Sequence, residues 1–166
     1  MFLVLLLLLW AVFILYMSTR SYQQQSIRPL LTSISHHIQI NYTLPDIHIH
    51  YAEKVYSLRN NAYGFIEFIF RKFAHVFVYG VLTLLIYMLT RKIWGRRLLS
   101  YCLPLLLILM VASLDETIQK YSENRTSSPY DVLLDLSGGC LALLIAICIE
   151  WILERRRSKN SSSLIS

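Results

Sequence analysis

Ionisable and hydrogen-bonding residues recur at helical spacing in the apolar second half of this sequence. Lys72, His75 and Tyr79 follow an i, i+3, i+7 pattern, which places their side chains on one face of a helix. An ammonium group, an imidazole and a phenol on one face can bind an anion or transfer a proton. Because such groups are costly in contact with lipid, we expect them to face water or the interior of a helix bundle.

Two later segments carry acidic side chains that can lie beside this face. Asp115 and Gln119 share one side of a predicted helix, and Glu116 points about 100° away. Asp131 and Asp135 stand one turn apart in the next apolar segment. These residues predict either an ion-pair network that clamps three helices or a pocket that holds a phosphate or carboxylate. The candidate pocket residues are Lys72, His75, Tyr79, Asp115, Glu116, Gln119, Arg125, Asp131 and Asp135.

Long apolar runs must position these residues. Hydrophobic residues make up 55% of the 166-residue chain, and the mean hydropathy is +0.49, which excludes an ordinary soluble domain. Four runs, at about residues 2–19, 73–89, 98–114 and 132–153, are long enough to cross a bilayer as helices. We therefore predict an all-α membrane protein with four transmembrane helices and a single domain over residues 1–166.

The basic residues predict how these helices are oriented. The formal charge of +6 is carried in short clusters beside the apolar runs, which favours a role in membrane orientation over nucleic-acid binding. The clusters in 91–97 and 155–159 are predicted to be cytoplasmic, and the acidic segment 115–131 is predicted to lie outside. Both termini of a bacterial plasma membrane protein would then be cytoplasmic, although Arg20 alone favours the opposite insertion of the first helix. A cleaved signal peptide is the weaker interpretation, because no basic segment precedes the first run.

The connection between the first two spans, residues 18–71, is predicted to be extracytoplasmic. Alternation in Ile47-His48-Ile49-His50 favours a strand, and Leu44-Pro45-Asp46 offers a turn before it, so we expect a small hairpin. A helical stretch should follow from about Ala52. Its last part, residues 62–71, is typical of a short interfacial helix that leads into the second span.

Histidine and cysteine residues offer a weaker signal for metal binding. His48 and His50 share one strand face, and with His36 or His37 they can bind a transition metal. An exposed polar face is the simpler interpretation, so no metal site and no cofactor are predicted. The cysteines lie in apolar runs without metal-ligand spacing, at Cys102, Cys140 and Cys148.

The polar motifs also occur in a distinctive order. The sequence reads Lys-x-x-His-x-x-x-Tyr at 72–79, Asp-Glu-Thr-Ile-Gln at 115–119, Arg125, and Asp-Val-Leu-Leu-Asp-Leu-Ser-Gly-Gly at 131–139. This order resembles the VanZ-like family of integral membrane proteins. Asp135 stands where the family pattern usually has Asn, which exchanges a neutral donor and acceptor for a group that only accepts when ionised. The resemblance implies a link to resistance to glycopeptide antibiotics of the teicoplanin type, for which the family is named.

Three functions are compatible with these features. The leading hypothesis is a non-enzymatic envelope protein whose outward polar pocket binds an anionic ligand, with membrane lipids, a lipid-linked cell-wall precursor or another envelope protein as partners. One alternative is a membrane hydrolase or transferase acting on a lipid-linked phosphate, in which His75 and Glu116 exchange protons. The sequence offers no nucleophile elbow, His-Glu-x-x-His helix or phosphate-binding glycine loop to support it. The other alternative is a small transporter, but apart from Glu150 the charges of the spans stay near one surface.

Overall fold

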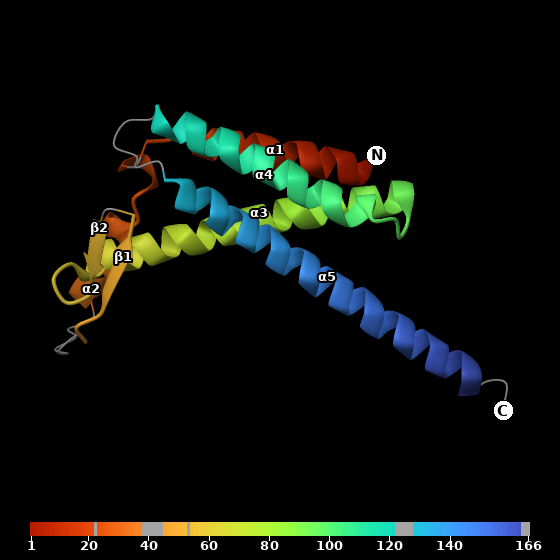
Figure 1. Cartoon of the computed structure of the whole chain (residues 1–166). Helices are drawn as coiled ribbons and strands as arrows, with labels where there is room; N and C mark the ends of the chain where they lie inside the picture. Colours follow the sequence, from red (N-terminus) through yellow and green to blue (C-terminus); the bar gives the residue numbers. More distant parts are fainter. Residues whose placement is uncertain (22, 38–44, 53, 122–127, 164–166) are drawn as a thin grey trace.

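The chain folds into a bundle of long helices with a small sheet at one end (Figure 1). The computed structural model describes residues 1–21, 23–37, 45–52, 54–121 and 128–163, with side chains left out at 34–37 and 159–163. The elements are α1 (Phe2–Thr19), a 3-10 helix η1 (Gln23–Gln25), α2 (Arg28–His37), β1 (His48–Tyr51), β2 (Lys54–Ser57), α3 (Ala62–Trp94), α4 (Leu99–Lys120) and α5 (Pro129–Ser163). The predicted all-α class is confirmed.

Four helices are long and apolar enough to cross a membrane: Phe2–Thr19, Ala62–Trp94, Leu99–Lys120 and Pro129–Ser158. α3 extends well beyond its predicted span at residues 73–89. Its 33 residues correspond to about 50 Å, more than a hydrocarbon core of about 30 Å requires. It begins at Asn61, whose side chain accepts a hydrogen bond from the Gly64 amide at 3.0 Å. It ends before Gly95, whose φ of 64° suits glycine.

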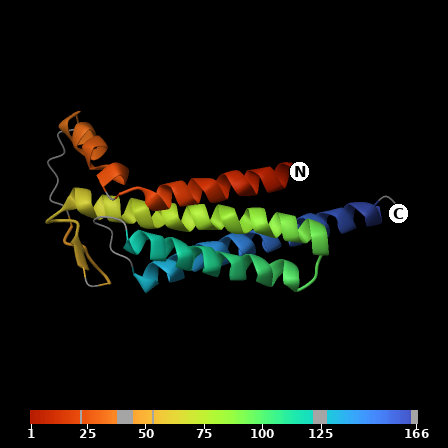
Figure 2. The same cartoon turned by 90° about the horizontal axis from the view of Figure 1, so that it is seen from above.

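The ends of the bundle differ in what they carry. The start of α1, the link between α3 and α4 and the C-terminal part of α5 lie at one end (Figures 1 and 2). The opposite end carries η1, α2, the two strands and the start of α5, and is called the hairpin end below (Figure 2). The first and last helices therefore have their free ends at the same end of the bundle, because four crossings return the chain to the side on which it began.

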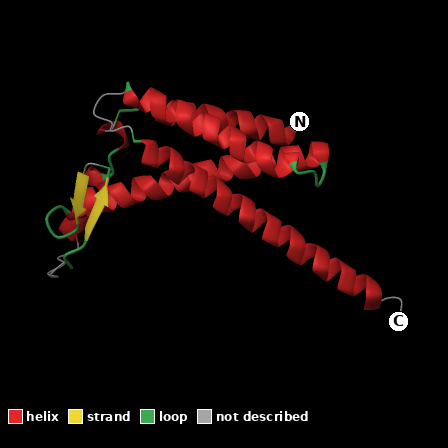
Figure 3. Ribbon diagram, in the orientation of Figure 1, coloured by secondary structure: helices red, strands yellow, loops and turns green. Residues whose placement is uncertain are grey.

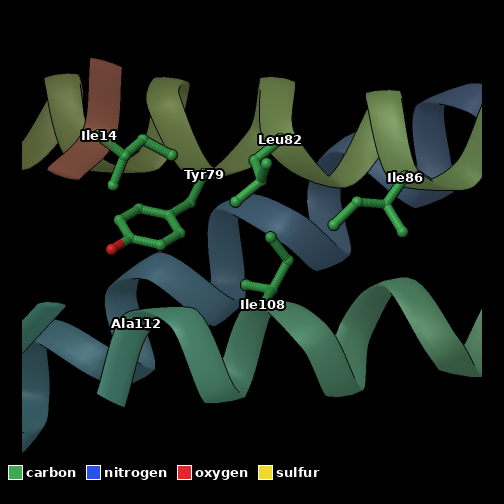
Figure 4. Packing of buried hydrophobic residues seen from close by; sticks show 6 residues of the cluster. All are labelled: Ile14, Tyr79, Leu82, Ile86, Ile108 and Ala112. Atoms are coloured by element: carbon green, nitrogen blue, oxygen red, sulfur yellow. The ribbon is translucent and has the colours of Figure 1, made fainter. Parts of the chain in front are cut away.

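Apolar packing at the centre of the bundle joins α1, α3 and α4. The buried cluster comprises Ile14, Tyr79, Leu82, Ile86, Ile108 and Ala112 (Figure 4). Trp10 of α1 donates from Nε1 to the Val78 carbonyl at 3.0 Å, a polar tie between two membrane helices.

A close contact between backbones joins α3 to α5. A Cβ atom added at Gly138 would lie 2.5 Å from the Val76 carbonyl oxygen, and one added at Gly80 would lie 3.3 Å from the Gly138 carbonyl oxygen. Glycine at these two positions allows the close approach of α3 and α5, because a larger side chain would contact the backbone of the other helix.

The hairpin forms, but its turn differs from the prediction. β1 and β2 pair antiparallel with Tyr51 opposite Lys54 (Figure 3), so the chain reverses just after Ala52, which has a φ of 52°. The predicted turn at 44–46 precedes β1 and does not join the strands, and its Leu44 lies outside the described residues. The predicted helix from Ala52 was wrong, because Val55 and Tyr56 extend to pair with β1.

Two helix boundaries also differ from the prediction, and one helix was not predicted. Residues 62–71 are not a separate interfacial helix but the first turns of α3, which runs without a break to Trp94. The 155–159 cluster is helical, because α5 continues to Ser163. The chain also forms α2, which was not predicted and which has Pro29 in its first turn, where proline costs no hydrogen bond.

Candidate functional site

Polar side chains from α3, α4 and α5 meet at the hairpin end of the bundle; we call this group the polar cluster. Lys72 of α3 donates to Oδ1 of Asp131 on α5. The Tyr51 hydroxyl of β1 donates to the same oxygen. The Lys72 ammonium also lies 4.3 Å from the centre of the Tyr51 ring. The hairpin therefore covers an ion pair between two membrane helices.

The second pair of the polar cluster lies one turn deeper. His75 Nδ1 is 3.1 Å from Oδ1 of Asp135, whose side chain is only 2% exposed. A buried carboxylate beside an imidazole fixes the orientation of the ring, and it also selects the tautomer that carries its proton on Nδ1. His75 keeps 19% of its side-chain surface exposed, so the ring reaches from the buried carboxylate toward the surface.

The third group involves Asp115 of α4. Its Oδ2 accepts hydrogen bonds from the Tyr79 hydroxyl and from Gln119 Nε2, both at 2.8 Å. Asp115 and Gln119 share one helix face, as their spacing predicts. The carboxylate is thereby held against α3 by donors from two helices.

Glu116 and Arg125 complete the set predicted from the sequence. Glu116 Oε1 accepts from the Ser128 backbone amide, so this side chain ties α4 to the segment that begins α5. Arg125 lies outside the described residues. The structure thus brings eight of the predicted residues to one end of the bundle, in contact with one another or with the adjoining backbone.

The polar cluster carries an excess of acidic groups among the described residues. Four buried carboxylates belong to it, those of Asp115, Glu116, Asp131 and Asp135, and Lys72 is its single lysine. The formal charge is −3 with a neutral His75 and all carboxylates ionised. Such an excess in a buried position favours a cation over an anion as a ligand.

Tyr51 was not among the residues predicted for the site. Burial and the hydrogen bond to Asp131 raise the pKa of its hydroxyl far above the ordinary value. Its ring also lies 5.3 Å from that of Phe68, which stacks at 4.0 Å on Tyr56 of β2. The period-two pattern of β1 offered a signal, because Tyr51 falls on the face opposite to His48 and His50.

The other face of β1 carries the two histidines of the metal site considered in the sequence analysis. His48 and His50 are both exposed in β1, and His48 Nε2 lies 2.8 Å from Oδ1 of Asp46. The side chains of His36 and His37, which would have to supply a further ligand, lie outside the described residues.

A cavity of about 440 Å³ lies on another side of α3, between α1, η1 and α3. Its polar lining consists of Arg20, Gln24, Gln25, Glu67 and Arg71, its apolar lining of Met17, Ile27, Phe70 and Ala74, and the amphipathic Tyr16 also lines it. Arg28 at the start of α2 donates from Nε to Glu67 Oε2 at 2.7 Å. This pairing joins residues that are 39 apart in the sequence, so no local sequence pattern indicates it.

A smaller polar group lies at the end opposite to the hairpin. Arg91 Nη2 of α3 is 2.7 Å from Glu150 Oε2 of α5, and the Tyr87 hydroxyl donates to Glu150 Oε1 at 3.0 Å. The buried stretch of α3 between this group and the polar cluster is mainly apolar, including Leu82, Leu85 and Ile86.

Four helices long and apolar enough to cross a membrane, with a polar cluster at one end of their bundle, define a multi-pass helical membrane protein. The family described as VanZ/LLP1 matches residues 2–152, and the chain belongs to this family. The predicted VanZ-like resemblance is thereby confirmed over nearly the whole chain. No curated protein and no solved structure matches the chain.

Proposed function

We propose that this protein is a non-enzymatic membrane protein of the bacterial cell envelope that binds an anionic lipid headgroup at its hairpin end. The observation that carries the proposal is the cavity between α1, η1 and α3, whose lining combines two arginine side chains with apolar side chains. A lipid phosphate, whether of a phospholipid or of a lipid-linked cell-wall precursor, likewise combines a charged group with a hydrocarbon chain.

The charges of the cavity favour an anion. Arg20 and Arg71 both line it, and the carboxylate of Glu67 is paired with Arg28. Counted with Arg28, three guanidinium groups stand at or beside the cavity against the one carboxylate of Glu67, a formal charge of +2, and guanidinium groups suit phosphate oxygens. Gln24 and Gln25 add amide donors.

The apolar lining suits the remainder of such a ligand. Met17, Phe70 and Ala74 line the cavity on the sides of α1 and α3. Because both helices are long enough to enter the hydrocarbon core, an acyl or prenyl chain can continue from the cavity into the bilayer along them.

The cavity fits an anion better than the polar cluster does. Among the candidate pocket residues, Lys72 and Arg125 are the basic groups that could hold an anion, but Lys72 is paired with Asp131. The surplus of carboxylates around His75 would also repel a phosphate. We therefore assign the headgroup to Arg20 and Arg71.

The proposed orientation places the cavity at the outer surface of the plasma membrane. The end opposite to the hairpin carries Arg91, Lys92, Arg96 and Arg97, followed by Arg155, Arg156 and Arg157 at the end of α5. Basic residues flanking spans are retained in the cytoplasm, so this end is cytoplasmic and both termini lie there.

Lipid retention by the purified full-length protein tests the proposal. After exchange into detergent with equal phosphatidylglycerol and phosphatidylcholine, native mass spectrometry should show preferential retention of phosphatidylglycerol. We expect Arg20→Gln/Arg71→Gln to lower this retention at least fivefold. The matched control, Lys92→Gln/Arg97→Gln, removes two exposed basic residues at the opposite end and should leave it unchanged.

Equal retention of both lipids by the wild type, or an unchanged preference in Arg20→Gln/Arg71→Gln, would contradict the proposal. Turnover of a lipid-linked phosphate that disappears in His75→Ala would instead favour the enzymatic alternative. Family membership also makes teicoplanin resistance a proposed phenotype, which is tested by comparing the teicoplanin sensitivity of a deletion strain with that of the complemented strain.

A further inference from the structure

We propose that His75, Asp115 and Asp135 bind a divalent transition-metal ion such as Mn²⁺, Fe²⁺ or Zn²⁺. Each side chain offers a ligand atom, and these atoms all lie within 4.8 Å of one another. The residues come from three different helices, α3, α4 and α5. This inference is independent of the proposed headgroup site, which lies on another side of α3.

One buried oxygen points to a missing partner. Asp115 is 6% exposed, and within the described part of the chain its Oδ1 is buried without a hydrogen-bond partner, although Oδ2 accepts two hydrogen bonds. A buried carboxylate oxygen without a partner costs free energy. A metal ion bound to Oδ1 would remove that cost.

The charge of the polar cluster supports the same conclusion. Lys72 already compensates Asp131 through a direct ion pair, and Glu116 accepts from a backbone amide. With His75 neutral, no ion pair within the described part of the chain compensates the carboxylates of Asp115 and Asp135. A divalent ion between them would balance both charges, as buried charges beside a membrane require.

The neighbouring hydrogen bonds orient the ligands as a metal site requires. Tyr79 and Gln119 hold Oδ2 of Asp115, which fixes the carboxylate and leaves Oδ1 available. Such partners outside the ligand set commonly fix ligating side chains. His75 Nδ1 lies 3.1 Å from Oδ1 of Asp135, a spacing that suits two ligands of one ion. When an ion replaces the Nδ1 proton and the ring carries its hydrogen on Nε2, the lone pair of Nδ1 can bind the same ion as the carboxylate.

The donor set selects the class of ion. An imidazole nitrogen with two carboxylates favours first-row transition metals, whereas Mg²⁺ and Ca²⁺ prefer oxygen ligands alone. Ligands at about 2.0–2.2 Å from an ion lie roughly 3–3.5 Å apart. The widest ligand-atom spacing, within 4.8 Å, is larger, so binding requires these side chains to close in by about 1 Å. Three protein ligands would leave a position open to water or to an anionic group.

Asp135 makes the inference specific to this chain. The VanZ-like pattern usually has Asn at this position, and Asn is a neutral and weaker ligand than a carboxylate. Asp135→Asn therefore gives a variant that removes one anionic ligand with almost no change in shape.

Metal binding by the untagged full-length protein in detergent tests the inference. Mn²⁺ titration followed by electron paramagnetic resonance, and Zn²⁺ titration by calorimetry, should each show one site per chain, and Mg²⁺ at the same concentration should not compete. We expect Asp135→Asn to weaken Mn²⁺ binding at least tenfold and His75→Ala to abolish it. Bound Mn²⁺ should also raise the thermal unfolding temperature of the wild type but not that of His75→Ala.

Two control variants make the assignment falsifiable. Glu150→Gln removes a carboxylate of α5, the helix that carries Asp135, at the opposite end of the bundle. His48→Ala/His50→Ala removes the exposed histidines of β1. Both variants should bind Mn²⁺ as the wild type does. The inference is overturned if the wild type binds neither ion stoichiometrically, or if folded His75→Ala and Asp135→Asn, checked by circular dichroism, retain wild-type affinity. Loss of binding in the β1 variant instead would also overturn it.

Discussion

Lys72 and Asp131 form an ion pair that joins α3 to α5 under the ring of Tyr51. The pair is mostly buried, with 17% of the lysine and 10% of the aspartate side chain exposed. Lys72 therefore holds the start of α5 against α3, and the hairpin shields both charges from water.

Removing the lysine alone should destabilise the protein strongly. Lys72→Met leaves the Asp131 carboxylate buried without its cation, which we expect to cost about 3 kcal/mol of unfolding free energy. Lys72→Met/Asp131→Asn should recover most of that loss, because no uncompensated charge remains. Thermal unfolding in detergent, followed by tryptophan fluorescence, measures both variants. An equal loss in the single and double variants would show that the pair contributes packing rather than charge compensation.

The close contact of α3 with α5 predicts an order among glycine substitutions. Gly138→Ala places a Cβ 2.5 Å from the Val76 carbonyl oxygen, whereas Gly80→Ala places one 3.3 Å from the Gly138 carbonyl oxygen. The first forces two backbones apart and should cost about 2–3 kcal/mol, and the second should cost less than about 1 kcal/mol. The same unfolding assay measures both, and a larger effect at Gly80 would refute this account of the contact.

Tyr51 predicts a loss of stability in alkaline solution. Its pKa in the folded protein is raised above the ordinary 10.0, so its contribution to stability is fully present below pH 10 and is lost as pH rises above that value. Unfolding temperatures measured from pH 8 to pH 11 should fall more steeply for the wild type than for Tyr51→Phe. Parallel curves would mean that the Tyr51 hydroxyl titrates normally.

The ion pair at the opposite end should matter much less. Arg91 and Glu150 keep 19% and 33% of their side chains exposed, so we expect Glu150→Gln to cost no more than about 1 kcal/mol, and the effect to shrink in high salt. Unfolding in 50 mM and 500 mM NaCl measures it. A loss as large as that of Lys72→Met would indicate that lipid shields this pair from solvent.

Hydropathy and helical spacing predicted the spanning helices and the residues that gather at the hairpin end. They could do so because long apolar runs have few alternatives to a membrane helix, and because the positions of Lys72, His75 and Tyr79 on one face follow from helical geometry alone. The joining of Lys72 to Asp131 depends on how the helices are rotated in the bundle, which the spacing within one helix does not specify.

The connection between α1 and α3 was predicted less well. Alternation predicts the strand at Ile49 but not its partner β2, because Val55 and Tyr56 are extended by pairing rather than by a strong local signal. The contact of Arg28 with Glu67 and that of Tyr51 with Asp131 link distant parts of the chain. Such contacts follow from tertiary packing and leave no local sequence pattern.

The Gly138 contact with Val76 lies beside His75 on α3 and one turn from Asp135 on α5. Two backbones that touch without an intervening side chain form a pivot, about which the helices can tilt but past which they cannot slide. In a thinner or thicker bilayer we therefore expect the far half of α5 to change its inclination, while the gap between His75 and Asp135 stays constant. The geometry of the His75–Asp135 pair would then be independent of the thickness of the host membrane.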